Sequence, residues 1–349
     1  MKAFPAKILY EFCEQVFRKA GLTAAHAQIM ADSLVDANLR GVDSHGVVRI
    51  PVYLDRLKSG AAKSCPEISV VAETPATALV DADCAMGQVA SVYATDLAIR
   101  KAKKAGMGFV SIRNSEHFGA AAYYGLRAAR QGLIGFAGSN TTAGMAAWGG
   151  AEPILGNNPF AIVAPAGEEY PNPIVVDMAT SVVAWGKILI AKGKGEKIPT
   201  HWALDCHGAP TDDPEAALSG VLLPFGEHKG FGIALAVEIL TGVLSGANFG
   251  KSVPHMYNDL DRPLYSGQFV AALDVEAFMP LATFKARLDE VVRQLHGSRP
   301  AKGFDRVYVP GEIEFERAEE RRAAGIPLSD TVIGELSEKG RELGIPFPS

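Results

Sequence analysis

The stretch GMGFVSIRNSEHFGAAAYYGLRAARQGLIGFAG, residues 106–138, decides the fold class. It begins with an apolar, β-rich run over 106–113 and ends with a second apolar run over 133–138. Between them, residues 119–131 follow a helical pattern, and their many small side chains imply close packing. A strand, a helix and a further strand in succession indicate an α/β core.

The same alternation continues on both sides of this unit. Further strands are expected at 77–81, 160–164, 174–176 and 268–274, and further helices at 89–104, 180–192 and 230–244, the last of them buried. Residues 193–215 are expected to form a loop. Helices are expected near both ends of the chain, at 5–20, 24–39, 278–295, 313–324 and 329–343, with an extended loop and strand over 297–312. These helices suggest a discontinuous lobe, made of 1–75 and 276–349, that flanks a central domain at 76–275.

Composition excludes several classes of protein. The chain has 349 residues, 48% of them hydrophobic and 21% charged, and a net charge of -5 without a basic cluster, so we expect no nucleic-acid partner. The longest apolar stretch, 232–247, contains Glu238 and is short for a bilayer, and the N-terminus lacks the pattern of a signal peptide. We therefore expect no membrane partner and a cytoplasmic location. The four cysteines lack metal-ligand spacing, so we expect reduced thiols and no metal site.

A polar stretch, DSHGVVRIPVY from Asp43 to Tyr53, contains the first candidate site residues. Ser44 and His45 lie in a glycine-flanked turn, and Arg49 and Tyr53 share a face if the segment is helical. An Arg beside a His suits a substrate with a carboxylate next to an alcohol or carbonyl group. The alternative is a surface turn followed by a solvated Arg.

Other polar residues directly follow predicted strands. His117, Ser139, Thr141 and Asp177 each lie at such a position, where α/β proteins often contact ligands. A nearby helix N-terminus would favour the neutral form of His117. Each residue could instead cap a helix or form an ordinary turn.

Glycine-containing segments provide a weaker signal. The turns at 148–150 and 156–159 read as plain turns, although glycine also permits close approach to a cofactor. Lys229 and Gly230 precede an apolar helix and could bind a phosphate, or they could belong to a solvated loop. The fingerprint G-x-G-x-x-G is absent, so a Rossmann first turn is not expected.

Taken in order, these motifs resemble one known family. They are Asp43-Ser44-His45-Gly46 with Arg49 and Tyr53, Glu116-His117-Phe118-Gly119, Gly156-Asn157-Asn158-Pro159, Val176-Asp177-Met178-Ala179-Thr180 and His228-Lys229-Gly230-Phe231-Gly232. The chain resembles the malate/L-lactate dehydrogenase family of the non-Rossmann type, from about residue 5 to about residue 330. That family includes sulfolactate and ureidoglycolate dehydrogenases, 2,3-diketogulonate reductase and piperideine-2-carboxylate reductases.

The resemblance implies a non-Rossmann NAD(P)-binding fold with a mixed central sheet, in a homodimer with the active site at the subunit interface. The implied function is hydride transfer between nicotinamide and C2 of a small 2-hydroxy or 2-oxo acid, such as malate, lactate or ureidoglycolate. NAD is slightly preferred over NADP as the cofactor, although Lys187, Lys192 or Lys194 could serve a 2′-phosphate. The alternatives are reduction of a cyclic imino acid, reduction of 2,3-diketogulonate, and an idle NAD-binding homologue.

The resemblance also implies roles for individual residues. Either His45 or His117 transfers the proton, and Asp177 orients His45 or contacts the cofactor. The expected substrate-binding residues are Ser44, Arg49 (on the carboxylate), Tyr53 and Thr141. The expected cofactor-binding residues are His117, Ser139, Asp177, Met178, Ala179, Lys229, Gly230, Gly303, Phe304 and Asp305.

Overall fold

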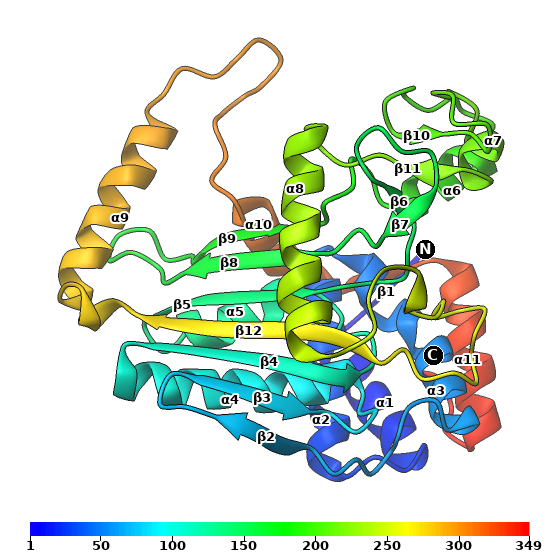
Figure 1. Cartoon of the computed structure of the whole chain (residues 1–349), viewed down its shortest axis with the longest axis horizontal. Coiled ribbons are helices and arrows are strands. Elements are labelled where there is room, and N and C mark those ends of the chain that lie inside the picture. Colours follow the sequence, from blue (N-terminus) through cyan, green and yellow to red (C-terminus); the bar gives the residue numbers. More distant parts are fainter. Residues whose placement is uncertain (349) are drawn as a thin grey trace.

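A seven-stranded sheet forms the centre of the computed structural model, which describes residues 1–348 (Figure 1). The strands lie in the order β2-β3-β4-β12-β5-β8-β9. Their bounds are β2 Ser69–Glu73, β3 Thr77–Asp81, β4 Met107–Ser115, β12 Ser266–Asp274, β5 Leu133–Ser139, β8 Phe160–Ala164 and β9 Ile174–Met178. The pair β3–β4 is parallel and the other neighbouring pairs are antiparallel. The predicted α/β class and mixed sheet are confirmed.

The pairing directions bring several strand ends to one edge of the sheet. β12 runs antiparallel to both β4 and β5, so β4 and β5 point the same way. β8 is antiparallel to both β5 and β9, so β9 shares that direction. The chain therefore leaves β4, β5 and β9 at the same edge.

Helices α4 (Gly87–Ala105) and α5 (Ala122–Ala129) lie behind the sheet in Figure 1, and α8 (His228–Glu238) crosses in front of it. A continuous apolar core joins α4 and α5 to the sheet. Its fully buried members include Val80, Ala90, Val110, Ile112 and Tyr124. Alanines make up much of the helix side of this core, which lets helix and sheet approach closely.

Helices from both ends of the chain pack together beside the sheet. They are α1 (Ala6–Lys19), α2 (Ala24–Leu39), α3 (Ile50–Ser59), α10 (Glu312–Ala324) and α11 (Asp330–Leu343). β1 (Lys2–Phe4) pairs antiparallel with β13 (Ile326–Leu328), so the two ends of the chain lie side by side. The side chains of Thr23 and Ser329 cap α2 and α11.

A smaller sheet, in the order β10-β11-β6-β7, lies apart from the main sheet, in the upper right of Figure 1. Its elements and their neighbours are β6 (Met145–Ala146), β7 (Pro153–Leu155), β10 (Ala203–Leu204), β11 (Val221–Leu222), α6 (Trp185–Lys194) and α7 (Pro214–Leu218). The expected loop at 193–215 is wrong in part, because β10 lies within it and α7 begins there. The expected helix start at Thr180 is also wrong, because Val182 donates its N–H to the carbonyl of Leu223 and keeps this segment extended.

The apolar helix expected at 230–244 is less buried than predicted. α8 begins at His228 and continues as a π-helical segment over Ile239–Val243. Leu235, Ile239 and Val243 are 42%, 49% and 55% exposed. Periodicity identifies an apolar face, but it does not reveal whether that face packs on its own chain.

The C-terminal region adds α9 (Leu281–His296), close to the predicted bounds, and a long extended segment over 297–311. The strand expected within 297–312 is not formed. Instead, the carbonyl of Pro310 accepts one hydrogen bond from Val175 in β9, which is too little for a paired strand.

Within residues 1–348, no helix combines the length and apolar character needed to cross a lipid bilayer. No group of three or more His, Cys, Asp or Glu side chains in the same range is arranged to hold a metal ion. The four cysteines are free thiols.

The central position of β4 leads to a stability prediction. Ile112 is fully buried in β4, so Ile112→Ala should lower the free energy of unfolding by about 2–5 kcal/mol through lost burial and a residual cavity. Urea unfolding at fixed protein concentration measures the change. The control, Val71→Ala on edge strand β2, should change it by less than about 0.5 kcal/mol because Val71 is 49% exposed. Equal effects of the two substitutions would contradict the prediction.

Candidate active site

One large cavity lies at the edge of the sheet where β4, β5 and β9 end, and its volume is about 1050 Å³. His117 follows β4, Ser139 ends β5 and Asp177 lies near the end of β9, and all three line the cavity. His45 and Arg49 close it from the helical part of the molecule. The fold thus brings together polar residues that lie far apart in the sequence.

His117 is held from behind by α4. A Cβ on Gly87 would lie 2.3 Å from the carbonyl oxygen of Glu116, so only glycine allows the helix to approach this closely. The next residue, Gln88, donates from Nε2 to Tyr53 Oη over 3.0 Å. Tyr53 Oη in turn lies 2.7 Å from Nδ1 of His117. The other ring nitrogen of His117, Nε2, remains available to the cavity.

Arg49 and His45 come from two short 3₁₀ turns that precede α3. Arg49 Nε donates to the backbone oxygen of Ser44 over 2.6 Å, and its guanidinium carbon lies 5.5 Å from the ring centre of Tyr257. Ser44 Oγ lies 2.9 Å from His45 Nδ1. The rings of His45 and His117 stack with their centroids 5.6 Å apart. One guanidinium and two imidazoles therefore line the same space.

The charge of Arg49 and the surrounding protein keep both imidazoles neutral. Burial and Arg49 lower the pKa of His45 to about 3. Burial also lowers the pKa of His117 well below its ordinary value, and Arg49, His45 and Arg56 lower it further. Burial lowers the pKa of Arg49 itself. An anion bound at Arg49 would offset the positive charge that both histidines experience.

A buried ion pair anchors the segment before His117. Arg56 and Glu116 are 1% and 2% exposed, and they share hydrogen bonds of 2.7 and 3.2 Å. Burial raises the pKa of Glu116, and Arg56 opposes that effect. Glu116 also accepts the N–H of Leu264. Arg56 donates to the carbonyl oxygens of Met256, Asp259 and Arg262. The pair therefore positions both His117 and the 256–264 part of the cavity wall.

Asp177 lies in a different environment. Its Oδ2 accepts the N–H of Ala122 over 3.0 Å at the start of α5. Protein surrounds the carboxyl group although the cavity exposes it to solvent, and burial raises the pKa of Asp177. Ala122 and Arg40 oppose this rise. Asp177 thus caps α5, and no hydrogen bond joins it to His45 within the described residues.

The remaining predicted residues of the strand ends do line the cavity. Met178 and Ala179 contribute to its wall. Ser139 Oγ donates to the backbone oxygen of Asn140 over 2.8 Å, and Thr141 Oγ1 donates to Asn157 Oδ1 over 2.9 Å. These bonds fix the loop after β5 against the loop before β8.

Six residues predicted for the site lie outside the cavity wall, and the first three of them are in α3 and α8. Tyr53 is buried behind His117 and does not face the space where a substrate would bind. Lys229 is exposed near the start of α8. Gly230 serves packing, because a Cβ there would lie 1.9 Å from the carbonyl oxygen of Phe225.

The late segment of the chain reaches the cavity farther along than the sequence suggests. Gly303, Phe304 and Asp305 are exposed and do not line it. Residues 308–311 line it instead. The extended segment after α9 offers no periodic pattern from which this position could be read.

Arg40 and Tyr257 line the cavity, and sequence reasoning missed both. Arg40 is 4% exposed, and its Nε and Nη1 atoms have no hydrogen-bond partner within the described residues. Asp36 Oδ2 lies 3.8 Å from Nη1. The sequence feature that could have identified Arg40 is its position as a charged residue at the end of an apolar helix, next to Gly41. Tyr257 lies in an irregular segment that gave no signal.

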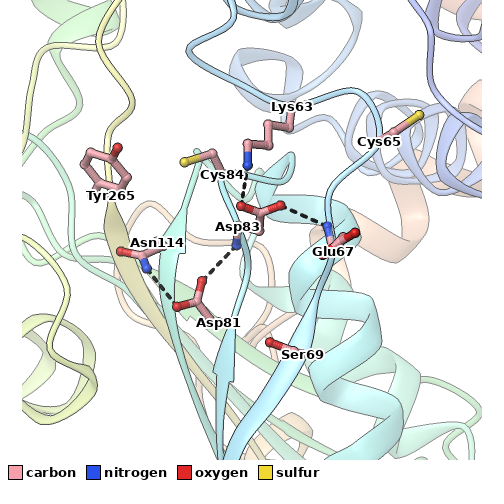
Figure 2. Close-up of a pocket in the computed structure, with 9 residues that line it drawn as sticks. All are labelled: Lys63, Cys65, Glu67, Ser69, Asp81, Asp83, Cys84, Asn114 and Tyr265. Carbon is pink, nitrogen blue, oxygen red and sulfur yellow. Dashed lines mark hydrogen bonds and ion pairs between the residues drawn. The ribbon is translucent and has the colours of Figure 1, made fainter.

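A second cavity, of about 620 Å³, lies near the ends of β3 and β4. Figure 2 shows two of its contacts: Lys63 Nζ lies 2.5 Å from Asp83, and Asn114 Nδ2 donates to Asp81 over 2.9 Å. Its lining carries one cation, Lys63, against the carboxylates of Glu67, Asp81 and Asp83, which makes it the weaker candidate for an anionic ligand.

Comparison with known proteins identifies the family of this chain. The family model described as malate/L-lactate dehydrogenase matches residues 4–337. The chain belongs to this family. It is accordingly an NAD(P)-dependent oxidoreductase.

Members of the malate/L-lactate dehydrogenase family are similar to this chain over nearly its whole length. The L-sulfolactate dehydrogenase of Methanocaldococcus jannaschii is 43% identical over 330 residues, which cover 95% of this chain and 94% of the relative. The malate dehydrogenase of Pyrococcus abyssi is 41% identical over 349 residues, which cover 98% of this chain and 95% of the relative. A solved sulfolactate dehydrogenase structure from M. jannaschii has a TM-score of 0.94 at 40% identity, covering 99% of this chain and 98% of the other.

The cavity fits the nicotinamide dinucleotide that this family implies. Its volume of about 1050 Å³ lies at the upper end of the usual range for small-molecule sites, which leaves room for a cofactor beside a small acid. Arg40 lines the cavity, and although Asp36 lies 3.8 Å from its Nη1, its positive charge suits a diphosphate. Asp177 offers an acceptor for a ribose hydroxyl.

The low pKa values in the empty site lead to a prediction about acid binding. Oxamate, a non-reacting analogue of a 2-oxo acid, should place its carboxylate on Arg49 and so raise the pKa of His45 and His117. The complex then binds more protons than the free enzyme. The affinity for oxamate should therefore rise as the pH falls from the pKa of the histidines in the complex to about 3, the pKa of His45 in the free enzyme. Above the pKa of the complex this gain is lost.

Titration calorimetry in two buffers of different ionisation enthalpy, with NADH present, measures the protons taken up. Net uptake is expected in the wild type, and it should disappear in Arg49→Met. Zero uptake or proton release on oxamate binding to the wild type would contradict the prediction.

Proposed function

We propose that this protein transfers a hydride between NAD(H) and C2 of a small 2-hydroxy or 2-oxo acid of the malate or sulfolactate type. The observation that supports this proposal is the arrangement of Arg49 beside two neutral imidazoles in a deep cavity. The relatives at 41% and 43% identity are named for malate and L-sulfolactate, both small 2-hydroxy acids.

In this proposal Arg49 binds the substrate carboxylate. A guanidinium binds a carboxylate through two parallel hydrogen bonds, which fixes the orientation of the acid. The bond to Ser44 and the contact with Tyr257 hold the guanidinium in place before the acid arrives. The C2 oxygen then points towards the stacked rings of His45 and His117.

His117 is the proposed proton donor in reduction and acceptor in oxidation. Its Nδ1 is engaged by Tyr53 behind it, so its Nε2 has a fixed direction. His45 bonds through Nδ1 to the exposed Ser44 hydroxyl, which gives it a less rigid support. We assign His45 to binding the acid together with Ser44 and Thr141.

Bound NADH supplies the hydride, and the chain holds the cofactor beside the acid. Arg40, Ser139, Asp177, Met178 and Ala179 are the proposed contacts. NAD is the proposed preference, because the carboxylates of Asp177 and Glu314 line the cavity and would repel a 2′-phosphate. The three lysines considered for that phosphate, Lys187, Lys192 and Lys194, do not line it.

A homodimer with the site near the subunit interface is also proposed. Leu235 in α8 and Ile239 and Val243 in the π-helical segment that follows it lie at four-residue spacing and form an exposed apolar stripe. An apolar surface of this kind is typical of a protein interface. Leu189 on α6 is 56% exposed and lines the cavity, so a partner that covers α6 and α8 would border the site.

Steady-state kinetics tests the proposed reaction. The wild type should oxidise NADH with oxaloacetate or sulfopyruvate, and His117→Ala should lower kcat by roughly 10²-fold or more, as loss of a general acid does. His201→Ala, on an exposed loop outside the cavity, is the matched control and should keep wild-type turnover. Turnover of a cyclic imino acid alone would favour the imine-reductase alternative, and NADH binding without turnover would favour the idle homologue.

Sedimentation analysis tests the proposed dimer. Ile239→Arg should yield a monomer, because burying the added charge in an apolar interface costs several kcal/mol. Val71→Arg, at an equally exposed position on β2, should remain a dimer. A wild type that is monomeric at assay concentrations would overturn this part of the proposal.

A further inference from the structure

The part of the cavity wall next to Arg49 carries a further imidazole, that of His255. His255 and Tyr257 both line the cavity. The ring centre of Tyr257 lies 5.5 Å from the guanidinium carbon of Arg49 and 6.1 Å from the ring centre of His255. One aromatic ring therefore contacts both the group proposed to bind the substrate carboxylate and an imidazole that has no role in the proposed proton transfer.

The backbone that follows His255 determines which of its ring nitrogens can donate. The N–H groups of Tyr257 and Asn258 both point to Nδ1 of His255, each over 3.3 Å. A backbone N–H can only donate, so Nδ1 is an acceptor, and turning the ring over would set a carbon against both donors. Neutral His255 therefore carries its proton on Nε2. The charged imidazole also has a hydrogen on Nε2, so this atom is a donor in either state.

Hydrogen bonds on both sides hold the segment that carries His255. Thr142 Oγ1 donates to the carbonyl oxygen of Pro254 over 2.7 Å, which joins the segment to the loop after β5. The N–H of His255 donates to Asp259 Oδ2 over 2.7 Å, and Arg56 donates to the carbonyl oxygen of Asp259 over 3.0 Å. These contacts fix the backbone, while Nε2 of His255 has no hydrogen-bond partner among residues 1–348. The donor is therefore held in position and free to bind a ligand.

The negative side chains of the cavity lie away from Arg49. Among the described residues, the wall has two carboxylates, Asp177 and Glu314. Burial raises the pKa of Asp177 and Glu314 adds to the rise, which places these two groups near each other. Burial and Arg49 lower the pKa of His45 to about 3, and no carboxylate in the described residues offsets them. The wall around Arg49 is therefore cationic, and a hydrogen-bond donor beside it favours a ligand with a second negative charge.

We propose that His255 selects 2-hydroxy and 2-oxo acids with a second anionic group, by donating a hydrogen bond from Nε2 to that group. The C1 carboxylate of the acid binds Arg49, and the distal carboxylate or sulfonate reaches His255 beside the ring of Tyr257. An acid that ends in a methyl group gains no such hydrogen bond. This role rests on the proposed function, because it concerns the same cavity and the same reaction.

Steady-state kinetics with a matched set of 2-oxo acids tests the proposal on the wild type. Oxaloacetate and sulfopyruvate carry a distal anionic group, whereas pyruvate shares their reacting centre and ends in a methyl group. With NADH, kcat/KM for at least one of the two dianions should be roughly 10-fold or more above that for pyruvate, because a hydrogen bond to a charged group is among the stronger ones.

His255→Phe keeps an aromatic ring and removes the donor. The variant should lower kcat/KM for the preferred dianion by roughly 10-fold or more, mainly through KM, and leave kcat/KM for pyruvate within about two-fold of wild type. The Kd of oxamate with NADH present, measured by titration calorimetry, should also stay within about two-fold, because oxamate has one carboxylate. Asn258→Ala is the matched control: the Asn258 side chain is exposed and outside the cavity wall, and the variant keeps its backbone N–H, so the kinetics should not change.

The possible outcomes separate the role of His255 from the proposed function. An unchanged kcat/KM for the dianion in His255→Phe, or an equal loss for the dianion and pyruvate, would contradict the selective role. A wild type that prefers pyruvate would do the same, and hydride transfer would stand in each of these cases. A wild type that reduces none of the three acids would overturn the proposed function, and the role of His255 with it. If His255→Phe does not fold, His255→Ala makes the same comparison, and the wild-type preference remains an independent test.

Discussion

The buried ion pair between Arg56 and Glu116 is the interaction on which the site depends most. It joins α3, the segment that follows β4, and the 256–264 segment of the cavity wall through one guanidinium and one carboxylate. Removing one partner of such a pair typically costs about 3–5 kcal/mol, because the other charge is left buried and uncompensated. His117 directly follows Glu116, so the same pair fixes the position of the imidazole.

The site combines this rigid support with an unusual electrostatic balance. One cation, Arg49, stands beside two imidazoles that burial and its own charge keep neutral. Without a ligand, the positive charge of Arg49 has no negative partner in the site. A small carboxylate supplies that negative charge. Binding of the acid and readiness for proton transfer are thereby linked through the same guanidinium.

Much of the fold and part of the site could be predicted from sequence. The strand–helix–strand pattern at 106–138 indicated the α/β class, and the polar residues after the strands led to His117, Ser139 and Asp177. The contacts of Tyr53 could not be predicted, because its hydrogen bond to His117 spans 64 positions and depends on how α3 meets α4. The position of Lys229 outside the cavity wall could not be predicted either, because a helix start has the same sequence signal whichever way it faces. The exposed apolar stripe that begins on α8 was predicted to be buried, because periodicity identifies an apolar face without showing whether that face packs on its own chain.

The most direct test of the central claim is a crystal structure of the protein with NADH and oxamate bound. We expect the oxamate carboxylate on Arg49, its C2 oxygen within hydrogen-bond distance of His117 Nε2, and the nicotinamide ring beside it near the ends of β5 and β9. Oxamate bound with its carboxylate away from Arg49, or with its C2 oxygen out of reach of His117, would rule out the roles proposed for these two residues.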